Sequence, residues 1–130
     1  MWKSKIILTI SMGLLVLIPI VIFAVVSVKP VKPGQYDQLA ICLTEKKVKM
    51  YGAYWCVHCQ AQKKAFGTSF AKINYIECSL PGGTGQTEAC IQAKIESYPT
   101  WEFGDGERIT GEIKLDQLAE KAECNSGGGE

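Results

Sequence analysis

Apolar positions are distributed unevenly along the chain, and their spacing changes near residue 35. Residues 6–28 form an uninterrupted run of 23 positions without a charged residue. Beyond that run, apolar residues recur at helical or strand spacing, which predicts a small α/β domain over residues 36–124 and a disordered, Gly-rich tail over residues 125–130. The expected helices cover residues 36–46, 56–70, 87–95 and 115–122, and the expected strands cover residues 48–53, 73–78, 100–103 and 107–110.

The apolar run has the length of a membrane span. As a helix, its 23 residues reach about 34 Å, against roughly 30 Å of bilayer hydrocarbon. The alternative is a cleaved signal peptide, which has a shorter apolar region of about 7–15 residues and a small-x-small cleavage site. Residues 24–27 (AVVS) match that site poorly. We therefore expect one N-terminal transmembrane helix within residues 1–28, followed by a stiff, Pro-containing linker over residues 29–35.

Charge and cysteine content place the domain and exclude one class of function. Beyond residue 34 the chain has ten basic and thirteen acidic residues, so its charge of −3 argues against nucleic-acid binding by a basic surface. Six cysteines in so small a chain are typical of an oxidising compartment. Positive charges before the apolar run favour an inside N-terminus. We expect a single-pass protein of the cell (inner) membrane with its catalytic domain extracytoplasmic, in the periplasm.

Two cysteines carry the expected chemistry. Cys56 and Cys59 form a C-x-x-C motif between an expected strand and helix, which is the thioredoxin pattern. At a helix N-terminus the thiolate is favoured, so we expect Cys56 to be an exposed nucleophile and Cys59, more buried, to resolve the mixed disulfide. His58 can add positive charge or a hydrogen bond to the Cys56 thiolate. A stabilised thiolate makes the disulfide form the stronger oxidant.

A proline and two aromatic residues complete the expected catalytic surface. Pro99 precedes a strand, as the cis-proline beside a thioredoxin-type active site does, so we expect a cis bond that presents the preceding backbone to a client chain. Trp55 and Tyr98 are expected to line a substrate groove beside the motif, whereas Trp101 is expected in the core.

Three segments make a family resemblance recognisable. Residues 50–63 (MYGAYWCVHCQAQK), 74–78 (NYIEC) and 96–103 (ESYPTWEF) resemble the thioredoxin-like domain fused to bacterial and plant vitamin K epoxide reductase homologues. The resemblance covers about residues 36–124. It implies a thioredoxin-like fold, a central mixed β-sheet flanked by helices. In that family the domain takes electrons from secreted proteins that form disulfides and passes them to a four-helix membrane domain, which reduces a quinone.

The sequence departs from the family pattern in three respects. Only one candidate span is present, so a quinone-linked, vitamin K epoxide reductase-like oxidase is expected as a partner in trans. Val57 stands where the family commonly has proline. Met50 stands where ordinary thioredoxins keep a buried acid that accepts a proton, which makes the chain less similar to a cytoplasmic reductase.

The other four cysteines are expected to have structural roles. The resemblance implies a disulfide between Cys78 and Cys90, and closing a loop of about 15 residues contributes around 3 kcal/mol in the chain-entropy model. Cys42 and Cys124 lie in the first and last expected helical regions, and we predict that they pair. The alternative is that one or both exchange electrons with the membrane partner.

Two further side chains have competing interpretations. The C-x-x-C motif with His58 could be half of a zinc site, but the sequence has no second ligand pair at suitable spacing, so we expect no metal. Glu77 either mediates proton transfer near the active site or is an ordinary charge on a strand face.

The sequence therefore predicts a membrane-anchored thiol-disulfide oxidoreductase that needs no cofactor of its own and forms disulfides in client proteins with free thiols. The alternatives are a disulfide reductase or isomerase with a different electron donor, and a non-enzymatic, thioredoxin-like module that binds client chains.

Overall fold

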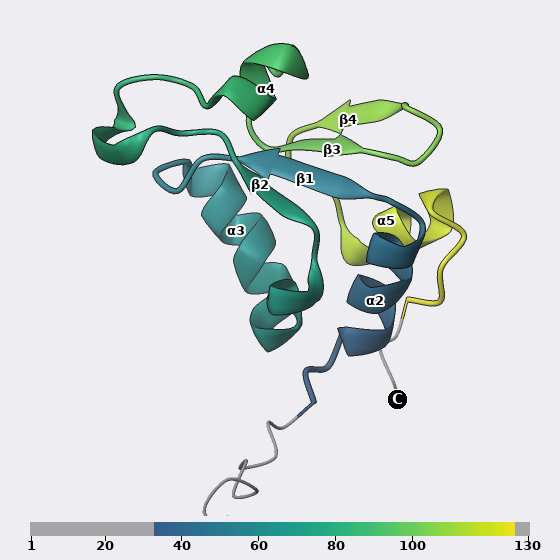
Figure 1. The fold of residues 1–130 in the computed structure, drawn as a ribbon. Helices are drawn as coiled ribbons and strands as arrows, with labels where there is room; N and C mark the ends of the chain where they lie inside the picture. The colour runs from purple at the N-terminus through teal and green to yellow at the C-terminus, as the bar shows by residue number, and fades with distance from the viewer. Residues whose placement is uncertain (1–32, 127–130) are drawn as a thin grey trace, which may run out of the picture. The chain divides into compact units, whose positions relative to one another are not determined.

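A computed structural model describes residues 33–126 of the chain (Figure 1). The expected anchor, residues 1–28, lies outside the described residues, as does most of the expected linker. Among the described helices, none combines the length and the apolar content needed to cross a bilayer. The described helices are α2 (Asp37–Glu45), α3 (Val57–Phe66), α4 (Glu88–Gln92) and α5 (Leu115–Lys121). The strands are β1 (Lys49–Gly52), β2 (Tyr75–Glu77), β3 (Thr100–Glu102) and β4 (Arg108–Thr110). Two 3-10 segments are η1 (Gly67–Lys72) and η2 (Pro81–Gly83).

The four strands form one mixed sheet in the order β2-β1-β3-β4. β1 runs parallel to β2, because α3 and η1 return the chain to the same end of the sheet, whereas β1 with β3 and β3 with β4 are antiparallel. This confirms the predicted α/β class with a central mixed sheet, and it is compatible with a thioredoxin-like fold.

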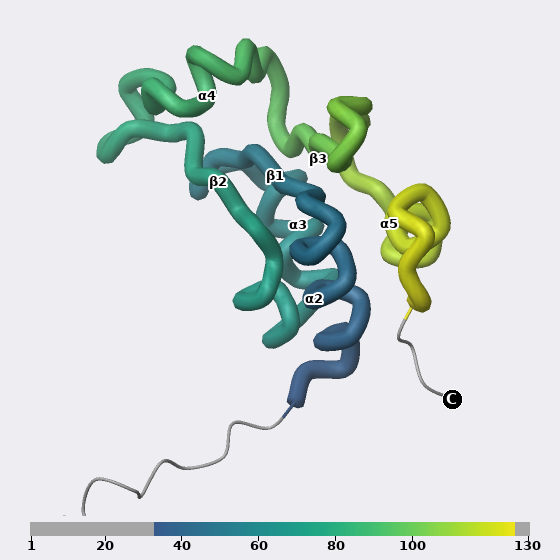
Figure 2. The backbone as a smooth tube through the Cα atoms, turned by 45° about the vertical axis from the view of Figure 1, so that its right-hand side comes forward, coloured from purple at the N-terminus to yellow at the C-terminus, as the bar shows by residue number. Residues whose placement is uncertain are grey.

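Alternation along the strands divides the buried residues between the two faces of the sheet. Met50 of β1 pairs with Trp101 of β3, and both side chains are completely buried in the larger apolar cluster with α2, α3 and α5. Tyr51 points to the opposite face, where a smaller cluster contains Cys78, Cys90 and Ile95. Figures 1 and 2 show α4 on that second face, across β1 from α3. The C-x-x-C motif therefore lies at the start of the helix that covers the larger cluster.

The helix after the C-x-x-C motif is shorter than the sequence pattern predicts. The prediction extended it to residue 70, but α3 ends at Phe66. Gly67 adopts a φ of +58°, and its N–H donates to the carbonyls of Lys63 and Lys64, so the α-helical path stops there. The 3-10 segment that follows brings Ser69 under the start of α2, where its hydroxyl accepts a hydrogen bond from the Tyr36 N–H at 3.0 Å.

One carboxylate connects three strands of the sheet. Glu102 of β3 accepts a hydrogen bond from Lys49 of β1 at 3.0 Å and pairs with Arg108 of β4. Arg108 also donates to the Ala93 carbonyl at the end of α4, at 2.8 Å. Burial alone would raise the pKa of Glu102, but the hydrogen bonds and charges of Arg108 and Lys49 outweigh it and lower the pKa below the ordinary carboxyl value.

Glu102→Gln should lower the free energy of unfolding at pH 7 by about 1–2 kcal/mol, because two charge-assisted hydrogen bonds become neutral ones. Since the folded-state pKa of Glu102 is depressed, this stabilisation is complete above the unfolded carboxyl value of about 4.3 and is lost as the pH falls through the folded value. Urea unfolding of both proteins across this pH range measures the difference. Glu96→Gln, at an exposed position, is the control, and a loss that does not depend on pH would contradict the electrostatic explanation.

Candidate active site

The turn between β1 and α3 brings Cys56 to the start of the helix. The Cys56 N–H donates to the Ala53 carbonyl at 3.0 Å, and the Cys56 carbonyl accepts from the Gln60 N–H at 3.0 Å. Cys56 is therefore the N-cap of α3, and no side chain caps the helix there. The positive end of the helix dipole favours negative charge at this position. Cys56 and Cys59 are both free thiols in the structure.

Cys56 is less accessible than the sequence predicts. The prediction was an exposed nucleophile, but Cys56 is 7% exposed and Cys59 is 0% exposed. The Tyr98 carbonyl lies 3.6 Å from Cys56 Sγ and accepts its S–H, which brings the loop before β3 against the sulfur. Only a small part of Cys56 is therefore accessible to solvent.

The loop before β3 has the backbone geometry that the sequence predicts. The Tyr98–Pro99 peptide bond is cis, and Pro99 is buried. The Tyr98 ring meets the Trp55 ring edge to face at 6.0 Å, which brings together the two aromatic residues of the expected groove. Trp55 is 54% exposed and its indole N–H donates to Ser79 Oγ at 2.8 Å, so the ring is held in one orientation although it faces solvent. Trp101, in contrast, is buried in the core.

His58 has a partner that the sequence did not predict. Its Nδ1 lies 2.7 Å from Glu112 Oε1, in the segment between β4 and α5, and both side chains are largely exposed. The structure therefore pairs one ring nitrogen of His58 with a carboxylate on another segment. Sequence spacing shows that His58 lies between the two cysteines, but it does not show that Glu112 lies beside it.

Cys59 lies in an apolar environment between α3 and the sheet. Its complete burial raises the pKa of the Cys59 thiol above the ordinary value, and the neighbouring Cys56 acts in the same direction. The Ala53 backbone and the Lys63 ammonium act in the opposite direction and do not cancel this effect. Cys59 is therefore protonated at neutral pH when it is a free thiol.

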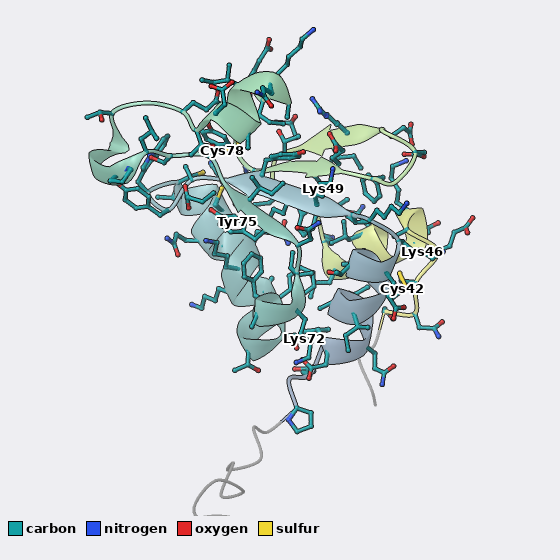
Figure 3. All side chains as sticks on the ribbon, in the orientation of Figure 1. Cys42, Lys46, Lys49, Lys72, Tyr75 and Cys78 are labelled. Atoms are coloured by element: carbon teal, nitrogen blue, oxygen red, sulfur yellow. A yellow bond between two sulfur atoms is a disulfide. The ribbon has the colours of Figure 1, made fainter. Side chains whose placement is uncertain are left out.

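Tyr75 and Glu77 of β2 form a hydrogen-bonded pair near Cys59. Tyr75 Oη donates to Glu77 Oε2 at 2.8 Å, and Glu77 Oε1 accepts from the Tyr54 and Ser79 N–H groups at 3.1 and 2.9 Å. Figure 3 shows Tyr75 where β2 passes across α3. Sequence reasoning considered Glu77 but did not identify Tyr75. The sequence feature that could have identified Tyr75 is its position two residues before Glu77, because residues two apart in a strand have side chains on the same face.

The remaining cysteines form two disulfides. Cys42 of α2 is joined to Cys124, just after α5, at a sequence separation of 82. Cys78, after β2, is joined to Cys90 of α4, with a separation of 12. The first bond connects the two ends of the domain, and the second attaches α4 to the sheet. Within residues 33–126, no three His, Cys, Asp or Glu side chains are grouped as metal ligands.

Comparison with known proteins agrees with the chemistry of this site. No family model matches the chain. A curated protein from Arabidopsis thaliana, thiol-disulfide oxidoreductase LTO1, is 48% identical over 86 aligned positions. The alignment covers 63% of this chain and 23% of the relative, so the chain matches about a quarter of that protein's length. The similarity supports a thiol-oxidoreductase-like domain with a role in disulfide exchange.

The two disulfides should contribute unequally to stability. In the chain-entropy model, Cys42→Ala/Cys124→Ala lowers the free energy of unfolding by about 4.5 kcal/mol, and Cys78→Ala/Cys90→Ala by about 3 kcal/mol, because the first bond closes the longer loop. Urea unfolding of the oxidised double variants measures both losses. The Cys42→Ala/Cys124→Ala variant could instead lose little stability while its Cys56–Cys59 pair is reoxidised much more slowly. That result would support the alternative in which Cys42 and Cys124 exchange electrons with a membrane partner.

Proposed function

We propose that this chain is a membrane-anchored, extracytoplasmic thiol-disulfide oxidoreductase that forms disulfides in client proteins. The observation that carries the proposal is the contrast among its cysteines. Four are paired between separate elements, whereas Cys56 and Cys59 are free, adjacent across one helical turn and buried to different degrees. The similarity to a thiol-disulfide oxidoreductase supports the same chemistry.

In the proposed reaction, a client thiolate attacks Cys56 Sγ of the oxidised pair. A client–Cys56 disulfide forms, the Cys56–Cys59 bond breaks, and Cys59 leaves with the electron pair and takes up a proton. A second client thiolate then attacks the client sulfur, forms the client disulfide and releases Cys56 as a thiolate. Two electrons have then passed from the client dithiol to the Cys56–Cys59 pair. Of the two protons that the client thiols lose, one is bound by Cys59 and the other enters the solvent.

The position of Tyr98 and Trp55 supports binding of an extended client segment. The Tyr98 carbonyl is beside Cys56 Sγ, so a client chain that pairs with this backbone would bring its cysteine to the sulfur. The exposed face of Trp55, together with Val57 at 72% exposure, provides apolar surface beside that path. His58 is proposed to act from the edge of this surface, where Glu112 Oε1 lies 2.7 Å from its Nδ1.

Reoxidation is proposed to occur at the membrane. The apolar run over residues 6–28 supports anchoring, and the resemblance of residues 50–63 to the domain fused to vitamin K epoxide reductase homologues supports a quinone-linked partner of that class. A disulfide of the partner would accept two electrons from Cys56 and Cys59 by the reverse exchange and pass them to quinone.

Cys59→Ala should convert the chain into a trap, because the mixed disulfide at Cys56 then lacks its resolving thiol. Non-reducing gels of cells that express the full chain should show adducts that reductant removes. Mass spectrometry should identify client proteins and a membrane oxidase joined to Cys56. In the matched control, Cys56→Ala/Cys59→Ala, these adducts should disappear, and their persistence would assign them to another cysteine. A trap without adducts would contradict the proposed reaction.

The reduction potential separates an oxidase from a reductase or isomerase. Because the N-terminus of α3 stabilises the reduced form as a thiolate, we expect a value nearer about −120 mV than about −270 mV, the thioredoxin value. Equilibration in glutathione buffers, followed by alkylation of the two free thiols, measures it. A potential close to that of thioredoxin would favour the reductase alternative.

A further inference from the structure

Cys59 must exchange a proton in every catalytic cycle, and its surroundings provide no acid on its own helix turn or on β1. As a thiol it is protonated, since burial raises its pKa, yet only its thiolate can attack the mixed disulfide at Cys56. Met50 occupies the β1 position where ordinary thioredoxins keep an acid, and it is completely buried in the apolar cluster. The proton must therefore travel to another element.

β2 brings a hydroxyl and a carboxylate to the required place. A Cβ on Gly52 would stand 2.9 Å from Cys59 Sγ and 3.2 Å from Tyr75 Oη, so these two atoms lie at most about 6 Å apart. Such a separation is spanned by direct contact or by one hydrogen-bonded water molecule. Because Tyr75 pairs with Met50 in the parallel ladder, its position beside β1 is set by the sheet. Tyr75 Oη in turn donates to Glu77.

We propose that Tyr75 is the catalytic residue that exchanges the proton of Cys59, and that Glu77 orients the Tyr75 hydroxyl and accepts the proton that Tyr75 releases. This inference rests on the proposed function. In the resolving step, the Cys59 proton passes to Tyr75 Oη while the Tyr75 proton passes to Glu77 Oε2. The Cys59 thiolate attacks Cys56 Sγ, the Cys56–Cys59 bond forms, and the partner leaves as a thiolate. The reverse transfers protonate Cys59 when a client opens the disulfide.

The charges around Tyr75 and Glu77 suit this exchange. Glu77 accepts two backbone N–H groups as well as the Tyr75 hydroxyl, and it is only half-buried, so it can exchange its proton with solvent. Burial and the Glu77 carboxylate raise the pKa of Tyr75, which keeps Tyr75 a neutral donor. The Lys63 ammonium lies 3.8 Å from the centre of the Tyr75 ring, where it favours the Cys59 thiolate once the proton has left.

The two sulfur steps can be measured separately with an aromatic disulfide, 5,5′-dithiobis(2-nitrobenzoate). Mixed at one equivalent with the reduced full chain, it is attacked by Cys56 and releases one thionitrobenzoate. Attack by Cys59 on the resulting mixed disulfide then releases the second one. The chain becomes oxidised at Cys56–Cys59 as the reagent is reduced to two thiolates. Cys59→Ala should retain only the first phase, which assigns the second phase to Cys59.

Tyr75→Phe and Glu77→Gln should each slow the second phase at pH 7 by at least about tenfold and leave the first phase unchanged. The matched controls Tyr36→Phe, at the start of α2, and Glu88→Gln, on exposed α4, should leave both phases unchanged. An unchanged first phase also shows that each variant is folded around Cys56. Imidazole, as an external base, should accelerate the second phase of Tyr75→Phe more than that of the original chain.

The pH profile distinguishes proton exchange from a purely structural role. In the original chain the second phase should slow at acidic pH, because the relay needs a carboxylate to accept the Tyr75 proton, whereas in Glu77→Gln this dependence should disappear and the rate should follow hydroxide concentration. A normal second phase, or an unchanged profile shape in both variants, would overturn the relay and leave the proposed function intact. If the original chain shows no phase that depends on Cys59, the proposed function itself is overturned.

Discussion

The close approach of α3 to the sheet at Gly52 is the constraint on which the site depends. A Cβ at this position would stand 2.9 Å from both Cys59 Sγ and the Tyr75 ring, so any larger residue would force the helix and β2 apart. With glycine there, the first turn of α3 packs onto β1, Cys59 is buried completely, and Cys56 remains at the helix end. The different environments of the two sulfurs follow from this single contact.

The rest of the domain keeps this contact in place. The Phe66 ring packs on Trp101 at 6.2 Å, which holds the far end of α3 on the same face of the sheet. Gln62, a buried polar residue of α3, both donates to the Ile113 carbonyl and accepts from its N–H, at 3.1 and 2.9 Å. These hydrogen bonds satisfy a buried amide and attach the helix to the segment before α5. The helix that carries the motif is therefore fixed along its whole length.

In the proposed reaction Cys59 reacts twice in each cycle, so the burial of its sulfur creates a proton-transfer requirement. An apolar site protects Cys59 from side reactions, but it also disfavours the thiolate that the reaction needs. In our proposal, Tyr75 and Glu77 meet this requirement from the neighbouring strand, and Lys63 provides positive charge from one turn further along α3. The same proposed arrangement serves both directions of electron flow.

Local patterns in the sequence were sufficient for the α/β class, the order of the elements and the C-x-x-C motif at a helix start, because strand and helix periodicity and turn residues act over a few positions. The end of α3 was missed because Gly67 takes a left-handed conformation that apolar spacing does not reveal. The burial of Cys56, the pairing of His58 with Glu112 and the approach of Tyr75 to Cys59 depend on strand register and on loops distant in sequence. Only the tertiary structure decided these features, since each joins residues whose separation along the chain carries no periodic signal.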